Sequence, residues 1–171
     1  VNIYVSDINM LNLKAMTGEL DFQWRNITLD NYTMFMESKD KGNYRVLRWR
    51  GARGANPVIY FNYSCKDPIL KSLFNNDKFR KALSLAINRE EINQLAYNGL
   101  GKPMQASLIS GVSYYSPEWE KAYAEYDPKR ANAMLDEIGL SKRDKDGFRL
   151  RPDGKRLELT LEYTPRYGPW T

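Results

Sequence analysis

The sequence contains no histidine and a single cysteine in 171 residues. Without an imidazole there is no Ser–His triad, no histidine acid–base group and no histidine-ligated metal. Cys65 alone can form neither an internal disulfide nor a Cys-x-x-Cys metal site. No apolar run approaches the roughly 18 residues that cross a bilayer, and neither the phosphate-loop pattern nor the Gly-x-Ser-x-Gly elbow occurs. What remains is a composition typical of a globular domain, with 42% hydrophobic and 27% charged residues.

The net charge is weakly positive, at +5 from 26 lysines and arginines against 21 acids. Most of the charge alternates in sign along the chain, which is typical of a solvated surface. One stretch is more basic, because four arginines surround Trp49: Arg45, Arg48, Arg50 and Arg53. Arginines interleaved with an aromatic ring can bind a polyanion. The alternative hypothesis is therefore a nucleic-acid or polyanion-binding module. The main hypothesis, given below, predicts no nucleic-acid partner.

Capping residues predict most of the helices. Asp67–Pro68 and Asp127–Pro128 each place an acceptor side chain before a proline, which is favoured at the first helical position. Asn88 with Glu91 resembles a capping box and predicts another helix start. The buried face of that helix is expected to hold three residues: Ile92, Leu95 and Ala96. Further helix starts are expected at Ser6 or Asp7, at Asp30, and at Asn76 or Asp77.

Alternating and continuous apolar runs predict strands between these helices. Residues 1–5, 19–24 and 44–49 are expected to form strands, and the continuous run 58–61 predicts a buried central strand. Residues 148–163 predict a hairpin that turns at Pro152, Asp153 and Gly154. The alternation of strands and helices favours an α/β fold. Because a strand pattern begins at the first residue, the sequence is expected to be a fragment of a longer chain.

Several residue groups suggest chemistry, but each has a simpler interpretation. Glu19 and Asp21 share one face of an expected strand and can serve glycoside hydrolysis or bind a cation, yet exposed acids are the preferred interpretation. Residues 144–147 resemble the start of a calcium loop but lack the distal glutamate, so a turn is preferred. Cys65 is interpreted as a structural thiol because no histidine can activate it. No cofactor is predicted.

The aromatic content is high, with 12 tyrosines, 4 tryptophans and 6 phenylalanines. Some of these side chains lie where a core does not need them. Trp24 and Trp170, together with Arg166, fall at the ends of expected strands. Because strand ends in α/β folds line clefts, these positions predict a ligand pocket with aromatic walls.

The run from Asp67 to Ile92 resembles the signature of the dipeptide- and oligopeptide-binding proteins of bacterial ABC importers, solute-binding protein family 5. Within it, Phe79-Arg80-Lys81-Ala82-Leu83-Ser84-Leu85-Ala86-Ile87-Asn88-Arg89 follows an asparagine, Asn62, that closes a strand. Flanking stretches agree in order and spacing: residues 13–21, 99–103, 115–117, 126–139 and 153–163. The similarity covers nearly the whole chain.

This resemblance implies an α/β fold of the type II periplasmic-binding-protein kind, an incomplete lobe with a mixed sheet flanked by helices. Residues 1–171 would form part of the second lobe of a two-lobed protein, and the first lobe and the rest of this lobe would lie outside the sequence. The family captures a solute by hinged closure of the lobes and does no catalysis. It implies a location in the periplasm or at the outer face of the bacterial membrane, with ABC permease subunits as partners. Contact with the membrane is expected only through the permease or an N-terminal anchor outside this sequence.

Six ligand-binding residues follow from the resemblance where its motifs match this sequence. Strand ends that face the family's cleft correspond to Gln23, Trp24, Arg25, Asn62, Thr164 and Arg166. The expected ligand is a peptide or another small solute. The bulky Trp24 and residues 142–148 depart from classical peptide binders, so oligosaccharide, nickel-complex and opine ligands, which occur among relatives, remain open.

Overall fold

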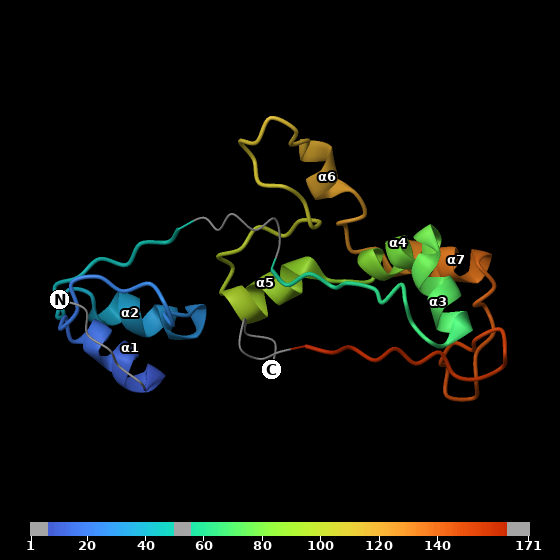
Figure 1. The fold of residues 1–171 in the computed structure, drawn as a ribbon, viewed down its shortest axis with the longest axis horizontal. Coiled ribbons are helices and arrows are strands. Elements are labelled where there is room, and N and C mark those ends of the chain that lie inside the picture. Colours follow the sequence, from blue (N-terminus) through green and yellow to red (C-terminus); the bar gives the residue numbers. More distant parts are fainter. Residues whose placement is uncertain (1–6, 50–55, 164–171) are drawn as a thin grey trace. The chain divides into compact units, whose positions relative to one another are not determined.

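The computed structural model describes residues 7–49 and 56–163 of the chain. It divides into two compact units, Val1–Gly51 and Ala52–Thr171, and each is described by itself. Figure 1 follows the chain from the blue helices of the first unit to the green, yellow and red elements of the second. The expected strand at residues 1–5 lies outside the described residues.

The first unit contains α1 (Ile8–Met16), the 3₁₀ turn η1 (Leu29–Asn31) and α2 (Tyr32–Ser38). Helix α1 begins as expected, because the side chain of Asp7 accepts a hydrogen bond from Met10 N at 2.8 Å. The small core of the first unit includes Leu11 and Phe35. The hydroxyl of Tyr44 donates to the carbonyl of Phe35 at 2.7 Å, which ties the extended segment that follows α2 to this helix.

The predicted cap of α2 is wrong. Asp30 lies inside η1, and Asn31 precedes α2 without a side-chain capping bond. The 3₁₀ turn supplies the first turn of this helical segment, so the helix does not need the aspartate as an acceptor.

The second unit contains five helices within its described residues: α3 (Pro68–Asn75), α4 (Asp77–Leu85), α5 (Arg89–Tyr97), α6 (Pro117–Lys121) and α7 (Pro128–Glu137). The expected caps are confirmed, since Asp67, Asn76, Asn88 and Asp127 each accept backbone hydrogen bonds at the start of a helix. Helix α4 packs along α7. One buried cluster comprises Leu73, Phe79 and Leu140, and a second comprises Ala82, Leu85 and Ala131.

The predicted buried face of α5 is wrong. Ile92 is 41% exposed and Leu95 is 80% exposed, whereas the buried residue of this helix is Asn93. The side chain of Asn93 accepts a hydrogen bond from Gly101 N at 2.8 Å, which satisfies it in the interior. No helix of the described second unit is closely packed against α5, so its apolar side chains remain at the surface.

The expected mixed sheet does not appear among residues 7–49 and 56–163, which form no strand. Pairing is limited to two isolated antiparallel bridges, Arg143↔Arg149 and Leu150↔Arg156, so the predicted hairpin is present only near its turn. Ile59 and Tyr60, predicted to lie in a buried central strand, are 50% and 86% exposed. A strand is held by hydrogen bonds to a neighbouring strand, and these extended segments have none here.

Candidate functional site

The predicted residues Gln23, Trp24 and Arg25 form one corner of the first unit, in which Gln23 is half-buried and the other two are exposed. They lie between α1 and η1, where Asn26 adopts a left-handed backbone with φ of 60°. The side-chain amide of Gln23 donates to the carbonyl of Arg25 at 2.7 Å. The guanidinium carbon of Arg25 lies 5.4 Å from the centre of the Trp24 ring, and that ring is 60% exposed. The corner therefore offers a flat aromatic surface beside a cation.

A second aromatic pair, which the sequence analysis did not assign to the ligand site, lies in the same unit. The rings of Phe22 and Trp49 are 6.0 Å apart at 37° to one another, and they are 65% and 67% exposed. Phe22 is two positions before Trp24, so the spacing of the aromatic residues was visible in the sequence. The contact with Trp49 was not predictable, because it joins segments that are 27 positions apart.

Asn62 lies in the second unit and acts in a turn. Its side-chain oxygen accepts a hydrogen bond from Ser64 N at 3.0 Å, and its carbonyl accepts from Cys65 N at 3.1 Å. This arrangement is an Asx turn at the end of the extended segment 58–61. The next residue, Tyr63, has the Arg80 guanidinium carbon 5.6 Å from its ring centre. Thr164 and Arg166 lie outside the described residues.

Glu19, one of the two acids that suggested glycosidase chemistry, is engaged by neighbouring side chains. Glu19 lies 2.6 Å from the Lys14 ammonium and accepts the Thr17 hydroxyl at 2.9 Å. Hydrogen bonds from Lys14 and Thr17 lower the pKa of Glu19, which is the opposite of what a general acid needs. The preferred interpretation of an exposed, solvated acid agrees with this geometry.

The candidate calcium loop is a turn closed by arginine. One oxygen of Asp144 accepts the amides of Asp146 and Phe148, and the other accepts Arg156 Nε at 2.7 Å. Arg156 also pairs with Asp146 at 2.7 Å and lies 4.2 Å from the centre of the Phe148 ring. Within residues 7–49 and 56–163, no group of three or more histidine, cysteine, aspartate or glutamate side chains is arranged to hold a metal ion.

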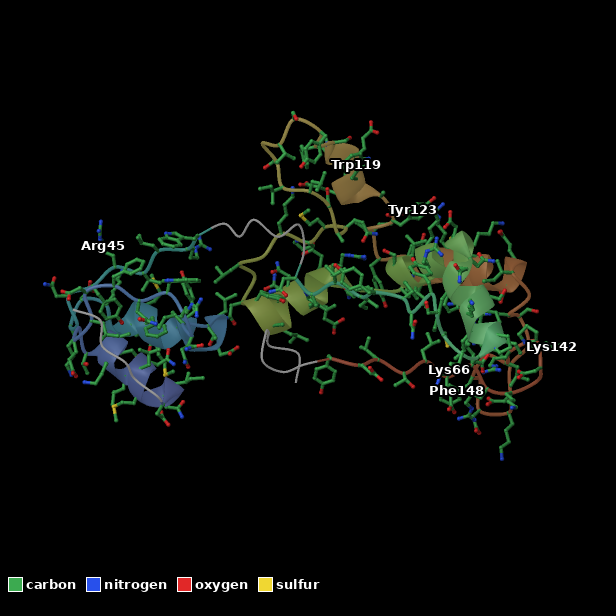
Figure 2. The ribbon with its side chains drawn as sticks, viewed as in Figure 1. Arg45, Lys66, Trp119, Tyr123, Lys142 and Phe148 are labelled. Carbon is green, nitrogen blue, oxygen red and sulfur yellow. The ribbon has the colours of Figure 1, made fainter. Side chains whose placement is uncertain are left out.

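The basic stretch around Trp49 is only partly described. Arg45 (Figure 2) and Arg48 are both exposed. Arg50 and Arg53 lie outside the described residues. In this segment Tyr44 and Val46 are half-buried while Arg45 and Leu47 are exposed, so the side chains alternate in exposure. The arginines are therefore surface residues.

A polar junction in the second unit was not predicted. The Ser84 hydroxyl accepts from Arg89 Nη2 at 2.8 Å and donates to the Tyr123 carbonyl at 2.8 Å. Arg89 Nη1 donates to the Ser84 carbonyl at 2.8 Å and to the Ala124 carbonyl at 3.3 Å, and burial lowers the pKa of its guanidinium. The sequence identified residues 88–91 as a helix start, but Ala124 is 35 positions from Arg89, so no local pattern indicates this contact.

Comparison with known proteins relates this chain to binding proteins of ABC transporters. A solved structure of the oligopeptide-binding protein OppA matches with a TM-score of 0.70 and 53% identity, over 89% of this chain and 25% of that one. OppA of Lactococcus lactis subsp. lactis is 30% identical over 80% of this chain and 23% of its own length. A probable ABC transporter-binding protein of Deinococcus radiodurans is 29% identical over 94% of this chain and 27% of its own length.

Residues 1–171 match the model of the bacterial extracellular solute-binding proteins, family 5 middle, and the chain belongs to this family. A putative ABC transporter peptide-binding protein of Brucella ovis is 31% identical over 83% of this chain and 24% of its own length. The chain thus spans about a quarter of the length of the relatives it matches. The structural neighbour OppA has a fold of the type II periplasmic-binding-protein kind, and this chain matches part of it. Among the described helices, none is both long and apolar enough to traverse a bilayer.

Proposed function

We propose that this chain is part of the substrate-binding component of an ABC importer, which captures peptide-like solutes for delivery to a permease. The observation that carries the proposal is the match to the oligopeptide-binding protein OppA at 53% identity and a TM-score of 0.70. The relatives with peptide-binding names support the same ligand class. The polyanion-binding alternative has no comparable support, because none of these relatives is named for such a ligand.

The proposed ligand surface in the first unit is the corner formed by Gln23, Trp24 and Arg25, extended by Phe22 and Trp49. Exposed aromatic rings bury apolar side chains of a peptide at a low cost in conformational entropy. The Arg25 guanidinium beside Trp24 suits a peptide carboxylate or main-chain carbonyl oxygens. Asn62, Thr164 and Arg166 remain predicted ligand residues.

We further propose that residues 1–171 belong to the second lobe and that the solute lies between two lobes. The family's extracellular description supports a location in the periplasm or on the outer face of the membrane, with permease subunits as partners. Binding without catalysis is part of the same proposal. The absence of catalysis is supported by three acids, each of which forms an ion pair with a basic side chain: Glu19, Asp144 and Asp146.

The proposal is tested by calorimetric titration of the two-lobed protein with the tripeptide alanyl-phenylalanyl-alanine. Trp24→Ala removes the exposed ring and is expected to weaken binding by about 5–30-fold, which corresponds to about 1–2 kcal/mol. Trp119→Ala is the matched control, because Trp119 is also about half exposed and lies outside the candidate surface. The Trp119→Ala variant should bind the tripeptide with the same affinity as the unmodified protein.

Absence of heat with this tripeptide and with a mixed peptide pool would contradict the proposed ligand class. Equal affinities of Trp24→Ala and Trp119→Ala would retain the ligand class and remove the proposed surface. Strong binding of an oligonucleotide that weakens steeply with added salt would instead support the polyanion alternative.

A further inference from the structure

The segment between α5 and α7 leaves the helices of the second unit, carries α6 and returns (Figure 1). We name residues 101–122 the strap. Its two legs meet at their base, where Gln105 N donates to the Glu120 carbonyl at 2.8 Å and Gln105 Nε2 donates to the Ala122 carbonyl at 3.1 Å. An ion pair between Lys102 and Glu120 closes the same base. Among the described helices, none is closely packed against α6, so polar contacts hold the strap.

The Ser84 hydroxyl joins this base to the helices. It donates to the Tyr123 carbonyl and accepts from Arg89 Nη2 and from Gln105 Nε2, all at 2.8–2.9 Å. A hydroxyl has one proton and two lone pairs, so these bonds use its full capacity. One atom of α4 thus connects the start of α5, the outgoing leg of the strap and the residue that follows the returning leg.

Tyr123, directly after the strap, has a strained backbone conformation. Its φ of 55° lies in the left-handed region, which is unfavourable for a bulky residue. Lys81 Nζ and the Arg130 guanidinium carbon lie 5.1 and 5.4 Å from its ring centre, and the ring packs against the cluster of Ala82, Leu85 and Ala131. Figure 2 shows Trp119 on α6 and Tyr123 at the point where the chain returns to the helices. The surrounding contacts hold this strained residue in place.

The returning leg also forms one wall of an open hollow of about 330 Å³. The beginning of α5, at Asn88, Arg89 and Glu90, lines the same hollow. The strap side is lined by Pro103, Glu120 and Lys121, followed by Ala124, Glu125 and Tyr126. The position of the strap therefore sets the width of this hollow.

We propose that the strap opens and closes at its base, with the Ser84 hydroxyl as its latch and Tyr123 as its hinge, and that opening widens the hollow beside α5. Loss of the hydroxyl removes a hydrogen bond from each of Arg89, Gln105 and Tyr123 at once. The packed helices α4 and α7 keep their apolar contacts in either position. This inference is independent of the proposed ligand.

Hydrogen–deuterium exchange of the purified protein, resolved by segment, tests the proposal with Ser84→Ala. The amide of Gln105, which donates to the Glu120 carbonyl at the base of the strap, is expected to exchange about tenfold faster, because the free energy of opening the base falls with the lost bonds. Amides of α4 and α7 should exchange at the original rate. Ser72→Ala, a substitution of an exposed serine on α3, is the matched control and should change neither segment.

Unchanged exchange in the strap would overturn the proposal, and so would equal acceleration in the strap and in α4 and α7. Where Ser84→Ala does not yield a folded protein, Gln105→Leu decides the question from the side of the strap. This variant removes the bonds to Ser84 and to the Ala122 carbonyl without altering a helix. Faster exchange confined to the strap supports the latch, and an unchanged rate refutes it.

Discussion

At the scale of single residues, Phe79 is the centre of the second unit. Its side chain is fully buried, and its ring lies 6.3 Å from the rings of both Phe61 and Phe74. Phe79, Ala82 and Leu83 are spaced by three and four positions, which is typical of one face of a helix, so the local sequence favours the burial of Phe79. Its contact with Phe61 joins a helix to an extended segment, and no periodic pattern in the sequence contains that information.

Phe79→Ala is expected to lower the free energy of unfolding by about 3–5 kcal/mol, because it removes a fully buried ring and leaves a cavity. Urea denaturation followed by circular dichroism measures the change. Phe148→Ala is the matched control, since this ring is 53% exposed and contacts the Arg156 guanidinium, and it should cost about 1 kcal/mol or less. Similar losses of unfolding free energy for the two variants would show that the three rings of Phe61, Phe74 and Phe79 are not the core.

At the scale of elements, most helix starts were predictable and strands were not. Helix starts at Asp67, Asn76, Asn88 and Asp127 depend on side-chain acceptors within a few positions, so the local sequence contains the information. The extended runs 44–49 and 58–61 need a neighbouring strand to become part of a sheet, and the described residues supply none. The same reasoning explains α5, whose exposed Leu95 has the pattern of a buried face but no element packed against it.

In the candidate site, too, contacts between sequence neighbours were predictable and contacts between distant segments were not. The corner at residues 23–25 was predicted from a motif, and its stacking is between sequence neighbours. The contact of Phe22 with Trp49 and the junction at Ser84 depend on residues far apart in the chain. Single-sequence patterns do not report such contacts.

The start of α3 predicts a pH dependence of stability. Asp67 accepts the amides of Ile69 and Leu70 and pairs with Arg151 at 2.8 Å. The hydrogen bond from Leu70, and then those from Arg151 and Ile69, lower the pKa of Asp67 below the ordinary aspartate value of 3.8. A carboxyl with a lowered pKa in the folded state stabilises the protein above its unfolded pKa, and this contribution is lost as the pH falls through the folded pKa.

Asp67→Asn retains a capping oxygen but removes the charge that pairs with Arg151. The variant is expected to be less stable than the unmodified protein near neutral pH, and the difference should shrink as the pH falls below about 3.8. Urea denaturation of both proteins across this range measures it. Asp127→Asn is the control, because Asp127 caps α7 through Arg130 N and has no ion pair among the described residues. If the stability difference between Asp67→Asn and the unmodified protein stays constant with pH, the lowered pKa assigned to Asp67 is contradicted.

At the scale of the whole molecule, the proposed mechanism requires more protein than this chain contains. The chain spans about a quarter of the length of the relatives it matches. In our proposal it belongs to one of two lobes that close on the solute. A solute held between two lobes makes part of its contacts with each, and closure removes it from water. One lobe alone supplies part of these contacts and cannot close.

The 171-residue chain alone is therefore expected to bind alanyl-phenylalanyl-alanine at least about 100-fold more weakly than the two-lobed protein, a loss of about 2.7 kcal/mol or more. Calorimetric titration of both proteins under the same conditions measures the ratio. The Trp24→Ala variant of the two-lobed protein serves as an internal reference, because it loses one contact and keeps the closure. If the chain alone binds the tripeptide as tightly as the two-lobed protein, the solute is held within one lobe, and the hinged capture that we propose does not contribute to its affinity.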